Sequence, residues 1–211
     1  MNVIDPGSYL ELDGGRSAVR FERVYDHPID RVWALVSEPT ELAHWFPFPR
    51  ITVDLAVGGE ITFAGDPNMP DMVLTGEVTA VDPPHLFAFT WGGDELRFEL
   101  TRLDGARTRL TLTDFLESPD AAARNAAGWD LCLAALDARA ASETAGSVAG
   151  SVAGEAAGEA AGEAAGAAVN RRSGERPARH RPSGPPPTWQ RRYDAYVAAG
   201  MPNGAPFPGS S

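Results

Sequence analysis

The chain has 211 residues, 43% of them hydrophobic, which is enough for one domain with a sizeable core and residues to spare. Its start has neither the basic residues nor the apolar run of a secretory signal, and no stretch approaches the roughly 18 to 20 apolar residues that span a bilayer. The one cysteine cannot form an internal disulfide. These features predict a cytoplasmic protein without membrane contacts.

The net charge of −11 is unevenly distributed along the chain. Residues 1–142 carry 23 acidic and 11 basic side chains, whereas residues 143–211 carry six acidic residues and seven arginines. A domain this acidic repels phosphate backbones, so we expect no nucleic acid partner.

The first elements are predicted from alternation and from proline positions. Residues 1–15 form a lead-in that can pair locally. Val19, Phe21 and Tyr25 then mark a strand with one buried face. Pro28 can open a first short helix and Pro39 a second, and the proline- and aromatic-rich segment 45–49 should fold over the edge of the core.

Six further strand signals follow, separated by turns at Gly92-Gly93 and Asp104-Gly105 and by an irregular loop at 66–71. They lie at residues 51–55, 61–63, 73–81, 87–91, 96–100 and 110–114. The pattern predicts an antiparallel meander. We therefore expect an α+β fold in which a curved antiparallel sheet of about six to seven strands wraps around a long C-terminal helix, with two short helices after the first strand.

That long helix is predicted from Pro119 to Ser142, with Ser118 as a possible cap. Apolar residues recur along it at steps of three and four and form one stripe that the sheet can cover: Ala122, Ala126, Trp129, Leu133, Leu136 and Ala140.

Three regions are predicted: a domain over 1–142, a flexible linker over 143–187, and a short aromatic helix and tail over 188–211. The linker contains tetrapeptide repeats whose recurring glycines each disfavour a helix by about 1 kcal/mol, followed by an arginine- and proline-rich stretch. Trp189, Tyr193 and Tyr196 lie on one face of the last helix, which we expect to dock on the domain in preference to a separate partner.

No catalytic residue, metal site or cofactor is predicted. The chain has no nucleophile elbow, its four histidines are scattered, and no second cysteine is available to complete a metal site.

Aromatic residues and one carboxylate are the remaining candidates. They predict either a packed core or a pocket for a small apolar molecule between the sheet and the long helix. The candidate ligand-binding residues are Trp45, Phe46, Phe63, Phe89, Trp91, Phe98, Asp114, Trp129 and Leu133.

Asp114 is in phase with Leu110 and Leu112, which points it inward. If it is buried, desolvation raises its pKa and makes it an acid or a hydrogen-bond partner for a ligand. It can instead cap the turn before Ser118. Arg23, in phase with Phe21, is a conceivable partner.

Several segments together resemble the SRPBCC (START-like) superfamily, in the branch related to the C-terminal domain of the Hsp90 ATPase activator. They cover about residues 18–142 and lie at 23–33, 39–46, 57–63, 76–91, 108–113 and 128–129. The resemblance implies a helix-grip fold with a hydrophobic tunnel between sheet and helix. Asp114 stands where many relatives have a histidine, and Trp189 with Tyr193 resembles the terminal helix of those relatives.

The superfamily includes lipid and hormone binders, polyketide cyclases, chaperone cofactors and many stand-alone bacterial members. The leading expectation is a non-enzymatic domain that binds a small hydrophobic ligand. The alternatives are a co-chaperone or protein-interaction module with a chaperone partner, and a cyclase- or hydrolase-type enzyme that uses Asp114.

Overall fold

The computed structural model describes residues 6–66, 69–153 and 187–205, and the side chains of 69–70 and 143–153 are not described. It has an eight-stranded antiparallel sheet of strand order β1-β2-β8-β7-β6-β5-β4-β3. The strands are β1 Ser8–Glu11, β2 Ser17–Tyr25, β3 Arg50–Val53, β4 Glu60–Asp66, β5 Met69–Asp82, β6 Leu86–Trp91, β7 Asp94–Arg102 and β8 Thr108–Leu116. The helices are α1 Ile29–Ser37, α2 Pro39–Leu42, α3 Ala122–Ala153 and α4 Pro187–Ala198, with 3-10 turns at Asp13–Gly15 and Pro119–Ala121.

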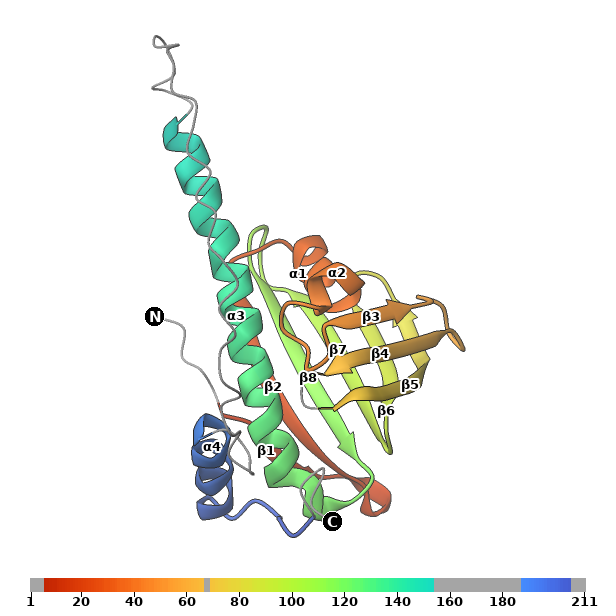
Figure 1. The fold of residues 1–211 in the computed structure, drawn as a ribbon. Helices are drawn as coiled ribbons and strands as arrows, with labels where there is room; N and C mark the ends of the chain where they lie inside the picture. The colour runs from red at the N-terminus through yellow and green to blue at the C-terminus, as the bar shows by residue number, and fades with distance from the viewer. Residues whose placement is uncertain (1–5, 67–68, 154–186, 206–211) are drawn as a thin grey trace, which may run out of the picture.

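The sheet curves around one side of α3, while α1 and α2 lie at one end of the space between them (Figure 1). Strands β3 to β8 form a meander, and β2 joins it beside β8. The predicted α+β fold is therefore confirmed. The sheet has one strand more than the highest expected number because the lead-in forms β1, which pairs with β2 from Ser8 opposite Arg20 to Glu11 opposite Ser17.

Turn residues set the register of the second half of the sheet. Gly92-Gly93 closes a two-residue hairpin in which Trp91 pairs with Asp94, and Gly92 has the positive φ of 60° that such a turn needs. The expected irregular loop is shorter than predicted because β5 already begins at Met69.

The long helix begins as predicted with a 3-10 turn at Pro119, but Ser118 makes no side-chain capping hydrogen bond. Beyond Ser142 the helix continues to Ala153, so the predicted end of the long helix at Ser142 is wrong, and the division into domain, linker and terminal helix stays a prediction. A nucleated helix gains one hydrogen bond per added residue, which offsets the low propensity of occasional glycines. The rest of the predicted linker, 154–186, lies outside the described residues.

Helix α4 docks on the same chain, beside the first half of α3 and the segment that leads into β1 (Figure 1). Tyr196 and Met201 are buried there, and the Ala123 amide donates to the Pro202 carbonyl at 3.0 Å. The expected docking within the chain is confirmed.

Candidate functional site

The predicted aromatic residues lie together between the sheet and α3. Phe46, from the segment between α2 and β3, is at their centre. Its ring centroid lies 5.1 Å from that of Trp91 on β6 and 5.4 Å from that of Trp129 on α3. Phe63 on β4 stacks on it at 5.2 Å. Edge-to-face and offset contacts of this kind add to the stabilisation from apolar burial.

The cluster continues across the sheet. Phe63 lies 4.7 Å from Trp91, and Phe89 lies 6.0 Å from Phe98, measured between ring centroids. Trp45 contacts Phe98 and donates its indole N–H to the Leu35 carbonyl at 2.9 Å, which fixes the segment over the core as expected. Leu133 is fully buried in the same core. The structure therefore brings the predicted residues together, and a ligand tunnel among them stays a prediction.

Asp114 on β8 is fully buried, so the prediction that it points inward is confirmed and the capping alternative is wrong. Its Oδ2 atom accepts hydrogen bonds from Trp129 Nε1 at 2.9 Å and from Asn125 Nδ2 at 3.0 Å. Its Oδ1 atom has no hydrogen-bond partner among the described residues.

Electrostatics favour a proton on this carboxyl. Desolvation by burial raises the pKa of Asp114 to about 7, and the negative charge of Asp94 also raises it, while the hydrogen bonds from Asn125 and Trp129 lower it. Near neutral pH the carboxyl of Asp114 therefore exists both as the protonated acid, which can donate a hydrogen bond, and as the carboxylate, which only accepts.

The sequence interpretation missed Asn125 and Asp94. The Asn125 amide also donates to Asp94 Oδ2 at 2.7 Å, and Asp94 Oδ1 accepts from the Glu117 amide at 2.7 Å. Asn125 therefore links two carboxylates. In the sequence, only its position one turn before Trp129 on the same helix indicated that Asn125 would lie on the face toward Asp114.

The conceivable partnership between Arg23 and Asp114 is wrong. Arg23 instead faces Asp130 and Asp137 on α3, with nitrogen-to-oxygen distances of 3.5 and 3.7 Å. Tyr25 donates to Asp137 at 2.8 Å. These contacts join β2 to α3, about one and a half to three turns beyond the Asn125 position.

Neither a metal site nor a membrane helix is found in the described part of the chain. There, no three or more His, Cys, Asp or Glu side chains gather in a way that could hold a metal ion. Over the same residues, no helix combines the length and apolar character needed to cross a membrane. We call Asp114 and the aromatic residues around it, between the sheet and α3, the interior site. Asp114 supplies hydrogen bonding and proton exchange there.

A curved antiparallel sheet around a long C-terminal helix, with two short helices after the first long strand, is the helix-grip architecture of the SRPBCC superfamily. Solved structures share it. The protein of unknown function EF2215 from Enterococcus faecalis is 22% identical with a TM-score of 0.52, over 62% of this chain and 74% of that one. Protein NE0264 from Nitrosomonas europaea is 21% identical with a TM-score of 0.53, over 64% of this chain and 99% of that one. Protein MLL2253 from Mesorhizobium loti is 24% identical with a TM-score of 0.52, over 60% of this chain and 98% of that one.

The sequence places the chain more narrowly within this fold. The family model described as activator of Hsp90 ATPase homolog 1-like protein matches residues 26–141, more than half of the chain. The chain belongs to this family. A comparison with curated proteins gave no match.

Proposed function

We propose that the protein binds a small, largely apolar molecule between the sheet and α3, held by one hydrogen bond to Asp114. The observation that carries this proposal is the unpaired Oδ1 atom of a fully buried carboxyl. Leaving a buried polar atom without a partner costs about 1–3 kcal/mol, so a hydroxyl or amine of a ligand that donates to Oδ1 recovers that free energy.

The aromatic residues supply the apolar surroundings for such a ligand. Phe46 contacts rings of both the sheet and α3, yet it belongs to a segment outside regular secondary structure. Its ring can be displaced with less disruption than a ring on a central strand such as Phe89. Displacement of Phe46 would give a ligand access to Trp91, Trp129 and Asp114.

Calorimetric titration with two probes of the same ring system tests the hydrogen bond. Para-phenylphenol has a hydroxyl donor and para-methoxybiphenyl has none, and the titration is made at about pH 8, where Asp114 is mostly ionised and acts as an acceptor. We expect the phenol to bind about tenfold more tightly, because one hydrogen bond to a buried acceptor contributes about 1.4 kcal/mol. In Asp114→Leu the two affinities should become equal, whereas the exposed control Asp71→Leu should keep the difference. Absence of binding, or equal binding of both probes by the unaltered chain, would overturn the proposal.

The family match favours a second candidate, a co-chaperone or protein-interaction module. Its ligand would be a chaperone surface and its effect a change in the ATPase rate of an Hsp90-type protein. A direct ATPase assay with and without this chain tests it, and an unchanged rate would remove it.

A further inference from the structure

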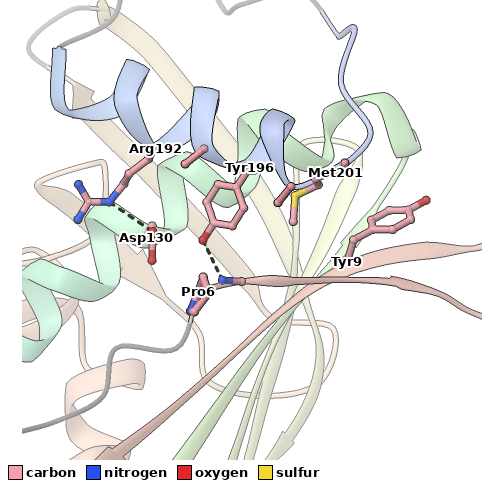
Figure 2. Close-up of a pocket in the computed structure, with 10 residues that line it drawn as sticks. Pro6, Tyr9, Asp130, Arg192, Tyr196 and Met201 are labelled. Atoms are coloured by element: carbon pink, nitrogen blue, oxygen red, sulfur yellow. Dashed lines mark hydrogen bonds and ion pairs between the residues drawn. The ribbon is translucent and has the colours of Figure 1, made fainter.

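A separate cavity of about 600 Å³ lies between the segment that leads into β1, helix α3 and helix α4 (Figure 2). Its volume is within the range of roughly 300–1,000 Å³ that is typical of small-molecule sites. The described residues that line it are Pro6, Gly7, Tyr9, Asp130, Arg192, Ala195, Tyr196, Ala199, Gly200 and Met201.

This cavity is distinct from the interior site. Successive residues on a helix point about 100° apart, so Asp130 faces the cavity while Trp129 faces Asp114 and the aromatic cluster. Of the described lining residues, Asp130 is the one within the residues that the family model matches, 26–141. The cavity therefore depends mainly on residues before 26 and after 141, which the family model does not match.

The charged groups at one end of the cavity are paired. Asp130 Oδ2 lies 3.4 Å from Arg192 Nε (Figure 2). Its Oδ1 lies 3.5 Å from Arg23 Nη2 on β2. The Tyr196 hydroxyl lies nearby and accepts a hydrogen bond from the Gly7 amide at 2.8 Å. Burial raises the pKa of Tyr196 to about 12, and the Asp130 carboxylate, to which the hydroxyl donates, also raises it, so the hydroxyl keeps its proton at physiological pH.

The other walls are largely apolar. Tyr9 and Met201 lie at the end of the cavity away from the ion pair, and Tyr196 lies between the two ends (Figure 2). Ala195 and Ala199 contribute small, exposed side chains, which leave the cavity open to solvent. Rings and a thioether next to open space favour a flat ring system.

We propose that this cavity is a second binding site, independent of the interior one, for a neutral ring compound that carries one hydroxyl. The ring lies against Tyr9 and Met201. The hydroxyl lies at the Tyr196 end, where it can both donate and accept a hydrogen bond. A charged ligand would compete for Asp130 or Arg192 and weaken the ion pair between them, which makes binding less favourable.

Nuclear magnetic resonance titrations of the full chain with three naphthalenes test the site and its charge preference. The probes are beta-naphthol, which is neutral, beta-naphthoate, an anion, and beta-naphthylmethylamine, a cation. We expect beta-naphthol to shift the amide signals of Gly7, Ala195 and Gly200 and to leave Gly105, in a distant turn, unchanged. It should bind about fivefold more tightly than either charged probe, the factor that an ion pair of about 1 kcal/mol predicts.

Two alanines of α4 provide a matched pair of variants. Ala195 lines the cavity and Ala198 does not, and both side chains are exposed. Ala195→Phe should weaken the binding of beta-naphthol at least tenfold, and Ala198→Phe should leave it unchanged. Equal effects of the two variants, no shifts at the lining residues, or a charged probe that binds as tightly as beta-naphthol would overturn the proposal. The comparison of the neutral probe with the two charged probes uses the unaltered chain. It therefore tests the proposal even if Ala195→Phe disturbs the docking of α4.

Discussion

The two sides of helix α3 differ in how they are packed. On the side facing the sheet, aromatic rings from β4, β6, β7 and the segment before β3 contact one another and Trp129, and Asp114 is fully buried among them. On the side facing α4, an open cavity is bordered by an ion pair whose Arg192 side chain is 34% exposed. The first side is held mainly by apolar burial, and the second by fewer and more solvated contacts.

Because of this difference, substitutions on the side facing the sheet should cost more stability than substitutions on the side facing α4. Removing a ring from the interior leaves a void that its neighbours cannot fill, whereas removing a polar contact near α4 exposes groups that water can satisfy. Burial raises the pKa of two described carboxyls, Asp114 and Asp137. Asp114 is fully buried in the interior, so it should dominate the pH response in the described part of the chain.

The largest effect is expected for Phe89→Ala in the interior. Phe89 on β6 is fully buried, and its truncation should lower the free energy of unfolding by about 3–5 kcal/mol in urea titrations. The control is Val73→Ala on β5, where the side chain is 60% exposed and the change should stay within about 0.5 kcal/mol. Similar losses for both would contradict the description of the interior as closely packed.

Asp114→Asn should remove a pH dependence that originates in the interior. The folded-state pKa of Asp114, about 7, is raised above the usual 3.8, so the folded chain holds the proton more tightly than the unfolded chain does. The resulting stabilisation is complete below about pH 4 and is lost as the pH rises through about 7. The variant lacks this loss. Its free energy of unfolding, measured relative to that of the unaltered chain, should therefore rise by a few kcal/mol between about pH 4 and pH 8, on the order of the free energy that the raised pKa of Asp114 represents.

Urea titrations at several pH values between these limits measure that gain. The control Asp71→Asn should change the free energy of unfolding by no more than about 0.5 kcal/mol, because the side chain of Asp71 is exposed. A gain that is independent of pH would mean that Asp114 is ionised throughout and would contradict the assigned pKa.

Tyr196→Phe should loosen α4 without unfolding the domain. The change removes the hydroxyl that accepts from the Gly7 amide, a contribution of about 1 kcal/mol. Hydrogen exchange of the α4 amides should become about fivefold faster, while the amides of α3 near Leu133 stay protected. Equal acceleration in both helices would show that the two sides of α3 unfold together.

Arg192→Gln should have the smallest effect. The Asp130–Arg192 pair is partly exposed and its charges are 3.4 Å apart, so its loss should cost at most about 1 kcal/mol. Unfolding measured at low salt and at about 1 M salt should show the difference shrinking as the charges are screened. A large loss that salt does not change would mean that Arg192 acts through packing.

Sequence patterns predicted the elements of the interior because they are periodic. Alternation along β8 placed Asp114 on the same face as Leu110 and Leu112, and the stripe on α3 placed Trp129 against the sheet. The partners of Asp114 could not be predicted in the same way. Asp94 begins β7 and Asn125 lies on α3, and whether these side chains meet Asp114 depends on how β7, β8 and α3 pack together in three dimensions.

The side facing α4 was harder to predict. The aromatic face of α4 and its docking within the chain followed from the spacing of Trp189, Tyr193 and Tyr196. The cavity did not, because it forms where Gly7 and Tyr196, 189 positions apart in sequence, come into contact. The end of α3 was misjudged because glycine propensity was weighed without the cooperativity of a helix that is already nucleated.

Native mass spectrometry of the freshly purified chain tests the central claim, a ligand anchored by Asp114, most directly. We expect the unaltered chain to carry a small-molecule adduct that Asp114→Leu lacks. Ala195→Phe, which blocks only the cavity beside α4, should retain it. An adduct present in equal amount on Asp114→Leu, or no adduct on the unaltered chain after exposure to para-phenylphenol, would contradict the account.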